Sequence, residues 1–339
     1  MKLNITLCFF LFTYFSLLAQ ESGSQVYKPK YNTITHKILR TEQNLTNKSG
    51  SGYNSMYKLL DDIIDSAKSK LDPIILDSLT DDREKAITIL QSINRTLKGF
   101  NFNLYIHTYT LTEMLTKKKM DCDTGSMLYI MVAQELNLPI YMVEVPNHSF
   151  IRYYYSDAEY LNWDTNVALG YSISPIYSDT QYMHGESVTN SSVFTIEEAV
   201  KNKYLQSMSL DDDEAYFYSL VLSLTDLKAR ETRKVLEKSL ELRPFSHLSR
   251  NNLAWFLLTT KEYANVKNDN IIALKLATEA VSMFEDNKAY NDTMGCACAS
   301  NGDFTKAIMY EKKGGNDKKQ LDGYKNNQTC FELGYRPQD

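Results

Sequence analysis

Apolar residues recur at helical spacing along most of this 339-residue sequence, but in one stretch they alternate with polar residues instead. Alternation is typical of a β-strand with one buried face, whereas steps of three and four residues are typical of amphipathic helices. The alternating segments are Ile140–Val145, Ser149–Tyr155 and Tyr160–Asp164, and helical patterns precede and follow them. The sequence therefore predicts an α+β domain with an antiparallel sheet at about residues 54–205.

The N-terminus has the features of a cleaved secretory signal over residues 1–19. Lys2 precedes an apolar run from Ile5 to Leu18, and this order of charge and apolar residues is typical of such signals. The run is shorter than the roughly 18–20 residues of a membrane-spanning helix, so an uncleaved anchor is the alternative. We expect a periplasmic or secreted protein with no membrane segment in its mature form, and a flexible linker over the Ser-, Thr- and Asn-rich residues 20–53.

Charge and cysteine content exclude several classes of protein. The chain has 37 basic and 42 acidic residues, a net charge of −5, so no basic field is expected to hold nucleic acid or an anionic membrane. Four cysteines remain after the signal, which is sparse for a disulfide scaffold. Cys296 and Cys298 fit the pattern of small buried residues. No spacing indicates a zinc site, and no cofactor is implied.

Beyond Asp211 every predicted element is a helix, and the pattern repeats. Residues 291–310 resemble a tetratricopeptide repeat, with Gly295 at the position of close helix packing. Two intervals agree with a 34-residue repeat, since Pro244 precedes Ala254 by ten positions and Ala280 precedes Gly295 by fifteen. We expect three repeats, an all-α array of helical hairpins, over residues 213–315, and a polar tail over residues 316–339. An unrelated helical bundle is the alternative.

Cys122 differs from an ordinary buried cysteine in its neighbours. It follows the cationic run Lys117–Lys119 and precedes a helix predicted over residues 123–137. A helix N-terminus and nearby cations both favour a thiolate and lower the pKa of a thiol. Asp121 and Asp123 oppose this effect. A nucleophilic cysteine is therefore expected here.

A nucleophilic thiol needs a base, and the base needs a group that orients it. His148 and Asp164 follow Cys122 in that order. If the two strands meet in a turn centred near Ser156, His148 and Asp164 face each other, with Cβ atoms about 4.5–5.5 Å apart. The other histidines, at positions 36, 107, 184 and 247, lack such partners and are expected to be surface or packing residues.

These segments resemble the transglutaminase-like superfamily of papain-type Cys-His-Asp enzymes. The resemblance lies in Met120–Ser126 around the cysteine, Val145–Arg152 around the histidine and Asn162–Thr165 around the acid. It implies that Cys122 is the nucleophile, His148 the general base and then acid, and Asp164 the residue that orients the imidazole. The backbone N–H of Cys122 can stabilise an oxyanion, and Asn103 and Tyr109 are candidates for a second donor.

We therefore expect an exported thiol acyl-transfer enzyme that acts on an amide or peptide bond. Hydrolysis by an amidase or protease and crosslinking by a transglutaminase differ only in the last nucleophile, so both stay open. The substrate is expected to be a protein or peptide, and the repeats to recruit a protein or peptide partner. The alternative is a non-catalytic interaction scaffold built on an inactive transglutaminase-like domain.

Overall fold

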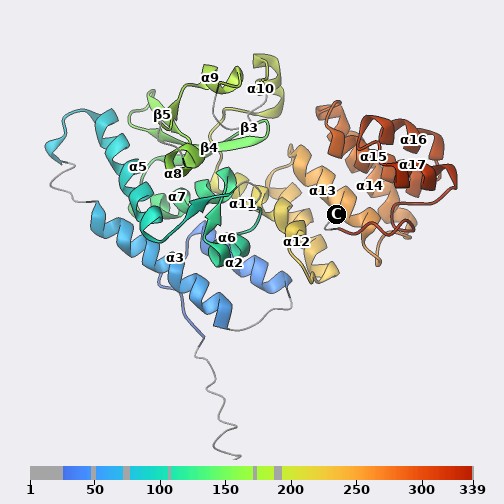
Figure 1. Ribbon diagram of the computed structural model, residues 1–339, viewed down its shortest axis with the longest axis horizontal. Helices are drawn as coiled ribbons and strands as arrows, with labels where there is room; N and C mark the ends of the chain where they lie inside the picture. The colour runs from blue at the N-terminus through green and yellow to red at the C-terminus, as the bar shows by residue number, and fades with distance from the viewer. Residues whose placement is uncertain are drawn as a thin grey trace, which may run out of the picture.

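The computed structural model describes residues 26–46, 51–71, 77–105, 108–170, 174–186 and 193–337 (Figure 1). The expected signal at residues 1–19 lies outside these ranges. None of the described helices is both long enough and apolar enough to cross a membrane. The helices that precede the sheet are α2 (Ile34–Leu45), α3 (Ser51–Lys70), α5 (Asp82–Gly99), α6 (Leu111–Lys117) and α7 (Cys122–Leu136).

The antiparallel sheet predicted from the alternating segments is present. Its strands lie in sequence order, and the first three coincide with the predicted segments to within about one residue. They are β3 (Ile140–Val145), β4 (His148–Tyr154), β5 (Tyr160–Trp163) and β6 (Ile176–Tyr177). A short parallel pair, β1 (Asn103–Leu104) with β2 (Lys119–Met120), lies before α7. The short helices α8 (Thr165–Gly170), α9 (Asp179–Met183) and α10 (Ile196–Asn202) follow β5.

Helix α7 is the centre of this domain. It lies between β3 and β4 on one side and α2 and α3 on the other (Figure 1). Every residue from Thr124 to Ala133 is buried, as expected of a helix that is covered on all sides. A hydrogen bond of 3.2 Å from Trp163 Nε1 to Tyr129 Oη joins β5 to this helix. The helix that begins at Cys122 is therefore held in place by the hydrophobic core.

Residues 26–46 do not form the flexible linker that was expected there. Helix α2 buries Ile38 and Leu39 completely in the main core. The buried carboxylate of Glu42 accepts hydrogen bonds from the backbone N–H groups of Leu111, at 2.9 Å, and Thr112, at 2.7 Å. These are free N–H groups at the start of α6, so Glu42 caps that helix. The many polar residues of the segment concealed its apolar face.

Residues 210–325 form three successive helix pairs and a final helix, in which each helix packs on the next one. We call them the helical array; they occupy the yellow to red half of Figure 1. The pairs are α11 (Leu210–Ser219) with α12 (Ala229–Leu242), α13 (His247–Thr259) with α14 (Lys267–Met283), and α15 (Lys288–Ser300) with α16 (Phe304–Lys313), followed by α17 (Lys318–Lys325).

The array and the α+β domain share part of their cores. Phe217 and Tyr218 of α11 belong to the hydrophobic core that surrounds α7. On the other side, Leu45 at the end of α2 belongs to the core of the array, and its carbonyl accepts a hydrogen bond of 3.1 Å from the backbone N–H of Lys228. The two parts are therefore packed as one body and not joined by a loose connection.

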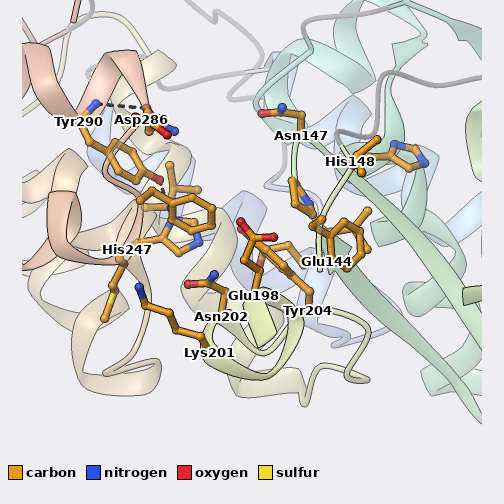
Figure 2. A pocket seen from close by; sticks show the side chains of 18 of the residues that line it. Glu144, Asn147, His148, Glu198, Lys201, Asn202, Tyr204, His247, Asp286 and Tyr290 are labelled. Atoms are coloured by element: carbon orange, nitrogen blue, oxygen red, sulfur yellow. Dashed lines mark hydrogen bonds between the residues drawn. The ribbon is translucent and has the colours of Figure 1, made fainter. Parts of the chain in front are cut away.

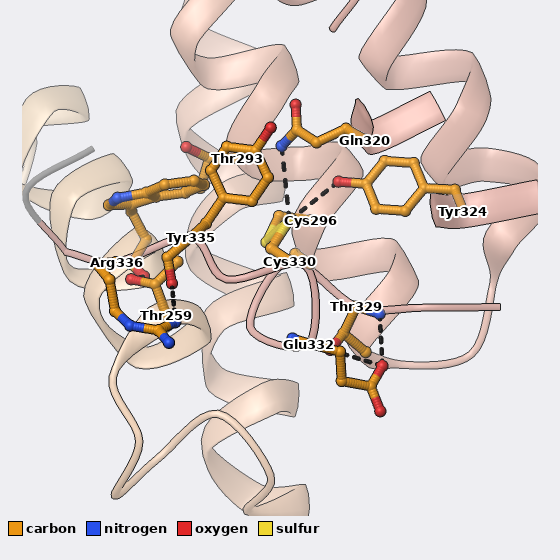
Figure 3. Close-up of a disulfide and its surroundings, with 12 residues drawn as sticks. Thr259, Thr293, Cys296, Gln320, Tyr324, Thr329, Cys330, Glu332, Tyr335 and Arg336 are labelled. Carbon is orange, nitrogen blue, oxygen red and sulfur yellow. Dashed lines mark hydrogen bonds between the residues drawn. A yellow bond between two sulfur atoms is a disulfide. The ribbon is translucent and has the colours of Figure 1, made fainter. Parts of the chain in front are cut away.

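The C-terminal residues are not the polar tail that was expected over residues 316–339. Helix α17 buries Tyr324, and a disulfide joins Cys330 to Cys296 of α15 (Figure 3). Tyr335 then packs edge-on against Trp255 of α13, with ring centroids 6.2 Å apart. Cys296 was expected to be a simple buried thiol, and its partner lies 34 positions away. Sequence spacing alone gives no signal for that pairing.

Gly295 lies at a close contact between α15 and α16. A Cβ atom there would be 3.1 Å from the carbonyl oxygen of Ala307 and 3.3 Å from the backbone N of Glu311. Both contacts are to backbone, which cannot move aside as a flexible side chain can. The position that the repeat pattern singled out therefore has room for a glycine or little more.

We expect Gly295→Leu to lower the free energy of unfolding by about 1–3 kcal/mol, because the added side chain overpacks the contact between α15 and α16. Urea unfolding followed by circular dichroism measures this. Gly99→Leu is the control: a Cβ there meets only Lys70 Nζ, at 3.7 Å, so stability should change by no more than about 0.5 kcal/mol. Equal effects of the two changes would contradict the prediction.

Candidate active site

Cys122 is the first residue of α7, and the residues on either side of it fix that position. The Asp121 carboxylate accepts a hydrogen bond of 3.2 Å from Thr124 N, and Thr124 Oγ1 accepts one of 3.1 Å from Asp121 N. This reciprocal pair is a capping box, which sets where a helix begins. Asp121 also accepts from the backbone N–H of Thr108, at 2.9 Å. The half-buried thiol thus stands at the helix N-terminus, as the sequence indicated.

His148 and Asp164 are in direct contact, as the sequence predicted. His148 Nε2 lies 2.8 Å from Asp164 Oδ2, and both side chains are buried. The other oxygen, Asp164 Oδ1, accepts hydrogen bonds from the backbone N–H groups of Asn166 and Val167, at 3.0 and 3.1 Å. The carboxylate is therefore held at both oxygens and fixes the orientation of the imidazole.

The strand register that creates this contact differs from the one expected. Ile151 pairs with Trp163, so the turn between β4 and β5 is centred one residue later than Ser156. Continued in this register, Asp164 lies opposite Phe150 and diagonal to His148. Diagonal neighbours on one sheet face are still within reach of long side chains, which explains why the contact forms in spite of the offset.

The thiol of Cys122 is surrounded by polar groups that centre on Asp123. Asp123 Oδ1 lies 3.6 Å from Cys122 Sγ and accepts a hydrogen bond of 2.7 Å from Ser149 Oγ. Its other oxygen, Oδ2, accepts one of 2.7 Å from Tyr216 Oη of α11. Three elements, α7, β4 and α11, therefore meet at one carboxylate. No sequence pattern indicated Tyr216, because its contact depends on how the array packs against the α+β domain.

Burial raises the pKa of the Cys122 thiol well above its usual range, and the charges of Asp123 and Asp121 raise it further. The lowered pKa expected from the lysine run is therefore wrong. The three lysines point elsewhere: Lys117 Nζ bonds to Glu113, and Lys118 and Lys119 lie over the rings of Phe102 and Tyr105. Sequence proximity did not place their charges beside the sulfur.

Cys122 and His148 line one cavity of about 580 Å³ between the α+β domain and the helical array (Figure 2). The facing wall contains His247, Phe284 and Tyr290 of the array. We call this cavity the cleft. Neither Asn103 nor Tyr109, the candidates for a second oxyanion donor, is among the described residues that line it.

Two of the other histidines in the described residues, His36 and His247, have side-chain partners that were not expected. His247, expected to be a surface or packing residue without partners, lines the cleft, and its Nδ1 lies 2.6 Å from Tyr290 Oη. His36 is a buried packing residue, 3.2 Å from Asp61, and His184 is exposed near Glu186. His107 lies outside the described residues.

Asp121, Cys122 and Asp123 bring three potential metal ligands within 4.8 Å of one another. Their carboxylate oxygens, however, already cap α7 and accept hydrogen bonds from Ser149 and Tyr216. These carboxylates therefore hold the start of α7 and the surroundings of the thiol, a role that explains their arrangement better than the binding of an ion does.

Comparison with known families gives one match. Residues 54–213 match the model of the transglutaminase-like superfamily, and no curated protein matches the chain. The matched residues contain Cys122, His148 and Asp164 and end within α11. A transglutaminase-like domain is therefore found at residues 54–213.

Proposed function

We propose that this protein is an exported thiol acyl-transfer enzyme that acts on amide or peptide bonds. Cys122 is the nucleophile, His148 the general base and then acid, and Asp164 the residue that orients the imidazole. The observation that carries the proposal is the 2.8 Å contact between His148 and Asp164 beside a cysteine that opens a helix in the same cleft. Hydrolysis and transglutamination are both within this chemistry.

The hydrogen bonds of Asp164 determine which imidazole nitrogen can act as the base. Both carboxylate oxygens accept, so His148 Nε2 carries a proton and donates it to Oδ2. The lone pair of Nδ1 is then free to take a proton. This is the division of roles that a cysteine nucleophile requires of its base and orienting acid.

The reaction then follows from these positions. Cys122 Sγ attacks the carbonyl carbon while its proton moves to His148 Nδ1, and the oxyanion faces the N–H of Cys122 at the helix start. The proton then passes from Nδ1 to the leaving nitrogen as the C–N bond breaks and a thioester remains. Water or an amine then gives a proton to His148 Nδ1 and attacks the thioester. As the C–S bond breaks, the proton on Nδ1 returns to the sulfur and the thiol is restored.

The raised pKa of Cys122 determines whether the free enzyme holds a thiol or a thiolate. Burial and the charge of Asp123 disfavour a thiolate, so the free enzyme holds a neutral thiol. Proton transfer then accompanies attack, as general-base catalysis describes. This differs from enzymes with a stable thiolate-imidazolium pair.

Export and partner binding belong to the same proposal. The Cys296–Cys330 disulfide supports an oxidising compartment, since such bonds are rare in reducing cytosol. The succession of three helix pairs and the close contact at Gly295 support tetratricopeptide repeats, which would recruit a protein or peptide substrate.

The test compares the exported proteins of cells that carry the wild type, Cys122→Ser or Cys298→Ser. We expect a cleaved peptide bond or a new isopeptide bond that depends on Cys122, detected by mass spectrometry. Cys298 is the other free cysteine of the described chain and is buried in the array, so its variant should behave as wild type. Identical peptide patterns in all three strains would favour the non-catalytic scaffold.

Asp164→Asn should keep the fold and lower turnover of that bond by about 10⁴-fold. The amide oxygen would stay with the two backbone N–H groups, so the NH₂ group would face His148 Nε2 and move the ring proton to Nδ1. Nδ1 would then carry the ring proton and could not accept the proton of the Cys122 thiol. The control is Asp157→Asn, in the exposed β4–β5 turn. A similar melting temperature with unchanged turnover would contradict the assigned tautomer.

Asp123→Asn should shift the alkylation of Cys122 to lower pH. The neighbouring carboxylate raises the pKa of the thiol, so removal of its charge favours the thiolate, and the iodoacetamide rate near pH 7 should rise severalfold. Rates are measured across pH 6–10 by peptide mass spectrometry, with Asp157→Asn as the control for a general loss of negative charge. An unshifted profile would show that Asp123 does not set the pKa of this thiol.

A further inference from the structure

The helical array supplies a complete second wall to the cleft. A series of rings crosses from one part of the protein to the other: Phe194 to Tyr204 at 5.5 Å between centroids, Tyr204 to Phe284 at 5.9 Å, and Phe284 to His247 at 4.6 Å. Phe284, at the end of α14, packs against the same hydrophobic cluster that contains Phe150 beside His148. The wall therefore continues the surface that supports the imidazole.

Polar contacts hold this wall in place. Arg243 of the array forms a buried ion pair of 2.7 Å with Glu144 of β3. Lys201 of α10 donates a hydrogen bond of 3.3 Å to the backbone carbonyl of Ser282, just before Phe284. Because buried and cross-element contacts of this kind fix relative position, the two walls form one preorganised site.

The charges along the cleft are unequal. Three exposed carboxylates line its mouth, namely Glu198, Glu285 and Asp286. Of the described lining residues, Lys201 is the only lysine or arginine, and it already donates to Ser282. An aromatic wall below a mouth rich in carboxylates suits a side chain with an apolar stem and a cationic end.

We propose that the cleft selects polypeptide substrates with a lysine or arginine side chain next to the reacting amide. The proposal rests on the function proposed above. Phe284 contacts the methylene stem, supported from behind by the buried ring of Tyr204, and Glu285 and Asp286 attract the cationic end. The array thus determines specificity for a reaction whose chemical groups belong to the transglutaminase-like domain.

The test uses three thiol-reactive peptides that differ in one side chain: chloroacetyl-lysine amide, chloroacetyl-norleucine amide and chloroacetyl-glutamate amide. Norleucine has the stem of lysine without its ammonium group. We expect the lysine probe to label Cys122 about fivefold faster than the norleucine probe at low salt, the effect of about one partly exposed ion pair. The glutamate probe should be the slowest, and 0.5 M salt should remove the differences.

Variants test the carboxylates at the mouth and the aromatic ring of the wall separately. Glu285→Gln with Asp286→Asn should abolish the lysine preference, measured as the ratio of the rates of the lysine and norleucine probes. The matched control, Glu241→Gln with Glu262→Gln, removes two exposed carboxylates of the array outside the cleft and should keep the preference. Phe284→Ala should slow the lysine and norleucine probes, which share the methylene stem, by a similar factor.

Equal rates for the lysine and norleucine probes, or a lysine preference that survives loss of Glu285 and Asp286, would overturn the inference. The inference would also be wrong if n-pentylamine protected Cys122 while the peptides showed no preference. The cleft would then bind a free amine and not the side chain of a polypeptide. A lysine preference in a protein that modifies no exported substrate would keep the cleft assignment and reject catalysis. The two proposals therefore fail in different experiments.

Discussion

The carboxylate of Asp123 is the point on which the arrangement of this protein depends. It accepts hydrogen bonds from Ser149 of β4 and Tyr216 of α11 and lies 3.6 Å from the sulfur of Cys122. A buried carboxylate is costly without such partners, so the helix that carries the thiol, the strand that carries the imidazole and the first array helix are held together. A shift in the position of any of these three elements therefore alters the surroundings of the thiol.

This linkage explains why the array and the transglutaminase-like domain do not act as separate modules. Tyr216 contributes to the surroundings of the sulfur, Phe284 contributes to the wall of the cleft, and Arg243 pairs with Glu144 beneath it. An array attached only to recruit a partner would need none of these contacts. In this chain the array also lines the cleft that contains Cys122 and His148.

The prediction of the site from sequence succeeded where local patterns carry the information. The alternating segments gave the three main strands, and the order Cys122, His148, Asp164 gave residues that lie on adjoining elements. It failed on the thiol pKa, because the direction of three lysine side chains cannot be inferred from their positions in the chain. It also missed α2, whose apolar face is embedded in a polar composition.

The sequence by itself determined the elements around the site: the strands β3 to β5, the approximate start of α7, and which residue types could perform acyl transfer. These follow from hydrophobic period and capping, which act over a few residues. Only the tertiary structure decided the strand register that places Asp164 diagonal to His148, the pairing of Cys296 with Cys330, and the second wall of the cleft. Each joins residues brought together by packing of the whole chain, and no local spacing encodes that packing.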